Sequence, residues 1–186
     1  MNIKEKKIIQ AIIYFASKTS NGQINRLKLM KLLWLADRYH LNKYGRLILP
    51  DKYYALPQGP VPSKTMNYSK ESIENAFEIN GYSIKAKSEF DPRYFSKSDL
   101  DIMEEIWERY GQYDQFELKE LSHNFPEWKR YEKELNDSAN LNSYPIVLDD
   151  FFKEPENDVN YEHDLEKSES SKTNFHFHTT IQDFLS

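Results

Sequence analysis

The chain has 186 residues, of which 39% are hydrophobic, and this is enough for one domain with an appendage. It contains no cysteine, which excludes disulfide bonds, thiolate zinc sites and thiol nucleophiles. No segment reaches the ~20 apolar residues that span a bilayer. The apolar run near Met1 is broken by Gln10, unlike that of a signal peptide. We therefore expect a cytoplasmic protein.

Charged residues are distributed unevenly along the chain. Residues 1–70 carry 13 basic and 3 acidic side chains, residues 71–152 carry 9 and 19, and residues 153–186 carry 3 and 8, which gives net charges of +10, −10 and −5. Either the first two parts pack together and neutralise each other, or the basic part faces an anionic partner. We favour mutual neutralisation, because exposed charges mostly serve to keep a surface hydrated.

The first half of the chain predicts two helices followed by a short strand. Apolar residues at helical spacing predict one helix over 3–18 and a second over about 25–43, with Gln23 to Asn25 starting the second helix. The second helix is apolar almost all round, which indicates that it is central, and Gly45 fits its left-handed terminator. We then expect a strand over 53–56, a tight turn over 58–62, and a helix from Pro62 to about Ser69.

The second half predicts a hairpin and several shorter helices. Residues 77–85 alternate around Asn80-Gly81, a dipeptide typical of two-residue type I′ turns, and the strand over 53–56 is expected to complete a three-stranded sheet. Helices are expected from a capping box of Ser98 and Asp101 to Tyr110, from Asp114 to about Asn124, from Pro126 to Leu135, and within 144–152. The fold class is mainly α, of the α+β type. We expect a compact helical domain around a central buried helix, with a small antiparallel sheet.

The C-terminal part of the chain differs from the rest in composition. Residues 153–172 are rich in Glu, Asp, Asn and Ser, which is typical of a solvated linker. Residues 175–185 are again apolar and are expected to fold back on the body as a strand or helix, or to bind another chain. We therefore divide the chain into a domain over 1–152 and a tail over 153–186.

No cluster of side chains indicates catalysis. His40 and His123 fit structural roles, and His176 and His178 would share one side of a strand only as a weak metal signature without a third ligand. There is no phosphate-binding or dinucleotide-binding glycine motif. We expect a protein that is not an enzyme and that needs no cofactor or metal.

Aromatic residues are abundant, with 13 Tyr, 11 Phe and 3 Trp, and they suit either a core or an interaction surface. The partner-binding candidates are expected to be exposed or to lie in the tail, and they are Tyr53, Tyr54, Gln58, Phe175, Phe177 and Phe184. Basic residues interleaved with aromatics in the first half make nucleic acid an alternative partner. It is less favoured, because the helix pair over 116–130, which resembles a helix-turn-helix, is acidic.

One pattern resembles a known family. The segments KLxKLLWLADRYH, YG and YxALPQGPV, with LSHNFPEWKRY at 121–131 and DDFF at 149–152, are similar to the Panacea domain of SocA-like antitoxins over about residues 5–152. Most motif residues are expected to maintain the fold, and they are Leu29, Leu32, Leu33, Ala36, His40, Gly45, Ala55, Gly59, Pro60, Val61, His123 and Trp128. Gln58 stands where the family more usually has an aromatic residue.

The resemblance implies an antitoxin that binds and neutralises a cognate protein toxin, in a toxin-antitoxin system of a bacterium or phage. Two alternatives remain at this point. One is a proteolytic adaptor that delivers a toxin to a protease, as one relative does. The other is a DNA-binding transcriptional regulator that uses the basic half of the chain.

Overall fold

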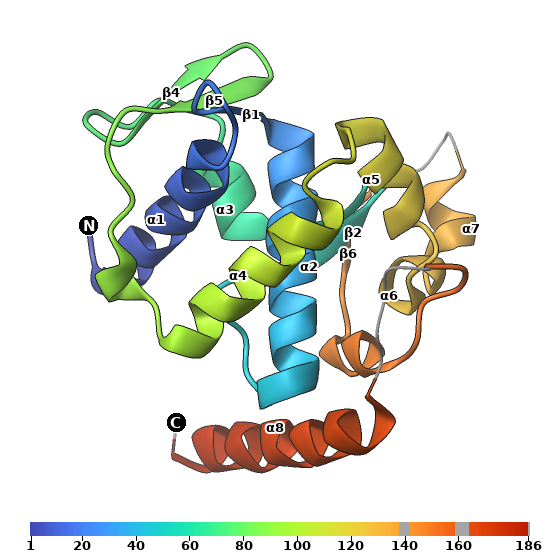
Figure 1. Ribbon diagram of the computed structural model, residues 1–186. Helices are drawn as coiled ribbons and strands as arrows, with labels where there is room; N and C mark the ends of the chain where they lie inside the picture. Colours follow the sequence, from blue (N-terminus) through green and yellow to red (C-terminus); the bar gives the residue numbers. More distant parts are fainter. Residues whose placement is uncertain (138–141, 159–163, 186) are drawn as a thin grey trace.

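The structure is a computed structural model that describes residues 1–137, 142–158 and 164–185, with the side chains of the last helix described as far as residue 181. At its centre is helix α2 (Arg26–Tyr44), whose residues 29–41 are all buried. Helices α1 (Ile3–Ser17), α4 (Lys97–Tyr110) and α5 (Gln115–Ser122) pack around it (Figure 1). Asn25 caps its first turn, and Gly45, with a φ of 69°, ends it as predicted.

Shorter elements complete the body. They are α3 (Ser63–Tyr68), α6 (Pro126–Lys129), α7 (Glu132–Leu135), and the 3-10 helices η1 (Pro92–Tyr94) and η2 (Leu148–Phe152). The mainly helical α+β fold around a buried central helix is therefore confirmed. The single helix predicted over 126–135 is instead the two short helices α6 and α7.

Two small antiparallel sheets lie at different places on the helical body. One has the order β1 (Gln23–Asn25), β5 (Ser83–Ala86), β4 (Phe77–Asn80), and the other the order β3 (Gly59–Pro62), β2 (Tyr53–Leu56), β6 (Tyr144–Pro145). The prediction that β2 joins the hairpin is wrong, because that place is taken by β1, whose residues the sequence pattern predicts as the start of a helix. Ile24 of β1 is opposite Ile84 of β5, and both side chains are buried in the core. The tight turn predicted over 58–62 is also wrong, since residues 59–62 form β3.

The predicted hairpin is present with its turn displaced by one residue. Asn80 is paired with Ser83, so the two turn residues are Gly81 and Tyr82. Only Gly81 has a positive φ, of 61°. That is the requirement of a type II′ turn, with glycine first, and not of the type I′ turn predicted from Asn80-Gly81.

Helix α4 begins earlier than predicted because of a buried carboxylate. Its capping box is formed by Ser96 and Asp99, and not by Ser98 and Asp101. Asp99 is 1% exposed and accepts hydrogen bonds from Lys7 at 2.8 Å and Arg46 at 2.7 Å. Burial alone would raise the pKa of Asp99, but the hydrogen bonds from His40 and Lys7 outweigh it and hold this pKa well below its usual range. The N-terminus of α4 is thereby fixed to α1 and to the end of α2.

The oppositely charged parts of the chain neutralise each other. Beyond the contacts of Asp99, ion pairs join residues 1–70 to residues 71–152 at Lys18–Glu104, Lys43–Glu105 and Arg38–Glu127. The favoured interpretation of the charge pattern is confirmed. These contacts also mean that many of the basic side chains of the first half are occupied within the protein.

The tail forms helix α8 (Leu165–Leu185), which lies across the C-terminal end of α2 (Figure 1). The prediction of a linker as far as residue 172 is wrong, and the apolar segment is a helix that folds back on the body. Ser168 Oγ donates to Asn42 Oδ1 at 2.7 Å, and the Phe175 ring lies 6.0 Å from that of Phe152. His176 and His178 therefore do not share one side of a strand. Among the residues that the structure describes, no helix is long and apolar enough to cross a membrane.

We predict that Arg38→Met strongly destabilises the protein, because it leaves the carboxylate of Glu127 buried without its cation. Both side chains are 0% exposed, and loss of one partner of such a pair costs about 3–5 kcal/mol. Lys43→Met in the same helix is the control, since its pair with Glu105 is partly exposed and contributes less than about 1 kcal/mol. Urea unfolding measures both, and equal losses of unfolding free energy would contradict the prediction.

Candidate partner-binding site

The turn between β2 and β3 is the most specific feature that the family-like motif builds. Leu56 is paired with Gly59, which leaves Pro57 and Gln58 as the two turn residues. Gly59 has a φ of 95°, and the Gln58 side chain is exposed at the tip. The turn therefore presents a polar amide group to solvent.

Buried side chains hold both strands that flank the turn. Trp128 Nε1 donates to the carbonyl oxygen of Leu56 at 2.9 Å, and Lys31 Nζ donates to that of Pro60 at 2.9 Å. Lys31 is 0% exposed. Burial, and then the nearby charge of Lys119, lower the pKa of Lys31 well below its usual range. One donor on each side fixes the position of the turn relative to α2 and α6.

Glycine at position 59 is required by space as well as by φ. A Cβ atom there would lie 2.5 Å from Lys31 Nζ and would also overlap Ser122 Oγ. The Lys31 amine and the end of α5 therefore approach the backbone of the turn as closely as only a glycine allows.

The imidazole ring of His123 packs against the indole ring of Trp128. The two rings are stacked, with centroids 3.7 Å apart and an interplanar angle of 10°. Burial lowers the pKa of His123 from 6.5 to about 4, against the opposing effect of Glu120. The imidazole is therefore neutral near pH 7, and it fills space beside the indole.

The remaining motif residues serve the fold. The apolar ones are buried in the core, and they are Leu29, Leu32, Leu33, Ala36, Ala55 and Val61. His40 is part of the Asp99 network, with Nε2 3.2 Å from Asp99 Oδ1. Gly45 lies against α8, where a Cβ atom would be 2.8 Å from the carbonyl oxygen of Ser171. The structure thus brings Gly59, Pro60, His123 and Trp128 together, with Ala55 packed in the same small cluster as Trp128.

The candidate contact residues do not form one surface. The expectation that Tyr53 is exposed is wrong: it is 3% exposed, and its hydroxyl donates to Asp37. Tyr54 is half-buried on the other face of β2, because side chains alternate along a strand. In α8, Phe175 is half-buried and Phe177 is 63% exposed. The side chain of Phe184 lies outside the described residues.

Sequence reasoning missed Lys31 and Ser122, the two groups closest to Gly59. From the sequence, Lys31 has no predicted role beyond its place in the central helix. The signal that would have corrected this was present, since a helix apolar on nearly all sides leaves a lysine no polar surface to occupy. Ser122 carries no comparable signal in the sequence.

A comparison with known families identifies the chain. The model of the family "Antitoxin SocA-like, Panacea domain" matches residues 29–129, which is more than half of the chain. The protein belongs to the SocA-like Panacea family. The match begins within α2 and ends with α6, so it contains Lys31, the Gly59 turn, His123 and Trp128. No curated protein and no solved structure matched the chain.

We predict that Gly59→Ala destabilises this Panacea protein by about 2–4 kcal/mol, since it combines backbone strain with a clash in a packed interior. Gly81→Ala is the matched control. Gly81 has a similar positive φ of 61°, but nothing lies within 4 Å of the added Cβ, so only about 1 kcal/mol of strain is expected. Comparable losses of thermal stability for the two variants would refute the steric argument.

We predict that His123 makes stability fall as the pH drops from about 6.5 to 4. Its folded-state pKa of about 4 is below its usual 6.5, so the unfolded chain binds a proton there while the folded chain does not. The unfolding free energy should decrease by about 1–3 kcal/mol over this window.

The variant His123→Phe keeps an aromatic ring against Trp128 and should flatten this part of the pH profile. His178→Phe, at an exposed position of α8, is the control and should keep the wild-type slope. Chemical unfolding at several pH values measures the slopes. An unchanged slope in His123→Phe would rule out the assignment.

Proposed function

We propose that the protein is an antitoxin that binds one cognate protein toxin in the cytoplasm and neutralises it by direct contact. Its membership of the SocA-like family supports the general role. The observation that carries the mode of action is the turn of Pro57 and Gln58, which Lys31 and Trp128 hold from within while its tip stays exposed. A turn held in this way loses little conformational freedom on binding, which favours recognition.

The proposal assigns binding and no chemical step to the protein. Lys31 and His123 have pKa values shifted by burial, but both groups serve to pack and position the turn. The interpretation therefore needs neither a cofactor nor a catalytic residue.

The two alternative functions have weaker support. A DNA-binding regulator would need free basic side chains, whereas Lys7, Lys18, Arg38, Lys43 and Arg46 all pair with carboxylates of the protein. A proteolytic adaptor that passes the toxin to a protease would share the toxin-binding surface. The two functions differ in the fate of the toxin, which an adaptor would cause to be degraded and which a direct inhibitor would leave intact.

Co-expression with the neighbouring gene tests the proposal. We expect the product of the adjacent reading frame to arrest growth when it is expressed alone, and this protein to restore growth while the toxin persists at an unchanged level. A neighbour that is harmless alone, or that stays lethal in the presence of this protein, would remove the proposal. Rescue together with a shortened toxin half-life would support the adaptor instead.

We predict that Gln58→Ala weakens binding of the neighbouring protein about tenfold or more, without lowering the unfolding temperature, because the side chain is exposed at the turn tip. Gln112→Ala, at an exposed glutamine beyond the end of α4, is the matched control and should bind as the wild type does. Titration calorimetry measures both variants. Equal affinity of Gln58→Ala and the wild type would exclude the turn from the interface.

A further inference from the structure

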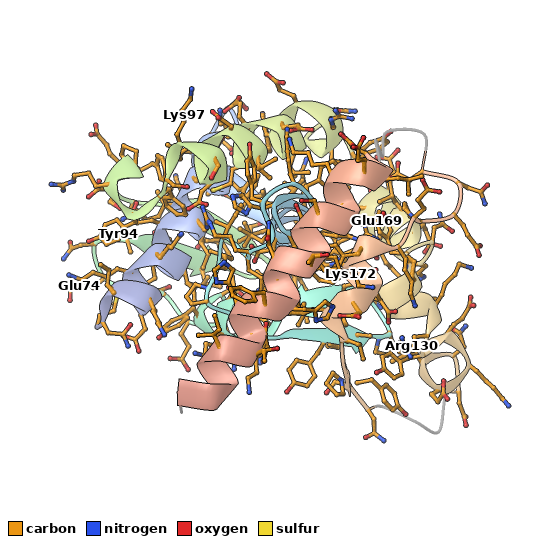
Figure 2. The ribbon with its side chains drawn as sticks, turned by 90° about the horizontal axis from the view of Figure 1, so that it is seen from below. Glu74, Tyr94, Lys97, Arg130, Glu169 and Lys172 are labelled. Carbon is orange, nitrogen blue, oxygen red and sulfur yellow. The ribbon has the colours of Figure 1, made fainter. Side chains whose placement is uncertain are left out.

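Helix α8 has one side that rests on the body. Its buried side chains are Ser168 and Ser171, 4% and 5% exposed, and Phe175 follows four residues later, half-buried against Phe152. This spacing of three and four residues is one face of a helix. In Figure 2 the helix crosses the front of the body, with Glu169 and Lys172 marked on it.

The opposite side of α8 carries two apolar side chains that are exposed to solvent. Phe177 is 63% exposed and Ile181 is 41% exposed. Phe177 comes two residues after Phe175, so it is rotated by about 200° around the helix axis, and Ile181 lies one turn further on the same side as Phe177. The two form an exposed apolar stripe on a helix that is already docked.

The segment that contains this stripe carries the net negative charge of the chain. The charges of residues 1–70 and 71–152 sum to zero, so the net charge of −5 is that of residues 153–186. Two of the three lysines of this segment, Lys153 and Lys172, already pair with carboxylates of the body. Glu166 and Glu169 are exposed and make no ion pair among the described residues. Glu166 lies about three turns before Phe177 on the same side of the helix.

We propose that the outward side of α8, with Phe177 and Ile181 toward its C-terminal end and Glu166 and Glu169 two to three turns before Phe177, is a docking surface for the toxin. This inference rests on the proposed function. The toxin surface that it fits is apolar where it covers Phe177 and Ile181 and basic where it meets Glu166 and Glu169, two to three helical turns away.

The way α8 is attached to the body suits this role. Ser168 donates a hydrogen bond to Asn42, and the Ser171 backbone lies directly against Gly45. The helix is therefore already folded and held in place, with the stripe turned outward, so that binding does not have to order it.

Binding of the purified full-length protein to the product of the adjacent reading frame tests the inference. We expect the double variant Phe177→Ala, Ile181→Ala to bind at least 30-fold more weakly than the wild type. Phe116→Ala is the matched control, because Phe116 in α5 is also 63% exposed, and it should bind as the wild type does. Because all three side chains are exposed, unfolding temperatures should stay close to the wild-type value.

Charge supplies a second and independent readout. Affinity of the wild type should fall as salt rises from low to moderate concentration, and the variant Glu166→Gln, Glu169→Gln should bind more weakly and with a flatter salt dependence. A wild-type complex that neither pair of substitutions weakens would overturn the inference and leave the proposed function standing. No wild-type binding at all would remove both.

The same samples also test whether a second copy of the chain, and not the toxin, covers the stripe. Light scattering of the free protein should give the mass of one chain for the wild type and for the Phe177→Ala, Ile181→Ala variant. A wild-type dimer that this double variant abolishes would assign the face to a second copy of the chain and overturn the inference.

Discussion

The fully buried ion pair of Arg38 and Glu127 is the contact on which the arrangement of the protein depends. Arg38 Nε donates to Glu127 Oε1 at 3.0 Å, and Trp34 Nε1 donates to the same oxygen at 3.0 Å. The guanidinium also lies 4.7 Å from the centroid of the Phe125 ring. Removing both charges from water is costly, so the pair is tolerable only where neighbouring donors and rings are in place. It therefore fixes α6 against α2 in one position.

The position of α6 decides the position of the turn between β2 and β3. Trp128 belongs to the same short helix as Glu127, and its indole reaches the Leu56 carbonyl at the base of the turn. Lys31, two turns before Arg38 on α2, reaches the other strand at Pro60. The central helix thus controls the turn by two routes, directly through Lys31 and indirectly through Glu127 and Trp128. Lys31 and Arg38 of α2 thus attach the helix to β3 and α6 within the protein.

Features set by neighbouring residues were predictable from the sequence. The buried helix α2, its glycine terminator, the Asp114 cap of α5 and the existence of the hairpin all depend on contacts within a few residues. Strand β1 and the choice of Ser96 over Ser98 as the cap of α4 were not predictable, because they depend on partners far away in the chain, namely β5 and the cations that surround Asp99.

The same distinction applies to the candidate site. The exposed tip at Gln58 follows from the turn itself. Burial of Tyr53 depends on Asp37, whose carboxylate accepts from the Tyr53 hydroxyl and from the backbone of Leu49 at 3.1 Å. Burial of Lys31 depends on the carbonyl of a strand that the sequence indicated only as a turn. Hydrophobic periodicity and secondary-structure propensity do not show which polar groups far apart in the chain will pair, and this part of the site could not be predicted.

The seat of α8 on the end of α2 has a consequence for how the protein can change over time. Contact is made there by the Ser171 backbone against Gly45, by the Ser168 hydroxyl on Asn42, and by Phe175 beside Phe152. The residues on the outward side take no part in that seat. This helix can therefore exchange its exposed residues for others while the body keeps its packing. If α8 docks the toxin as proposed, the choice of partner is separate from the requirement to fold.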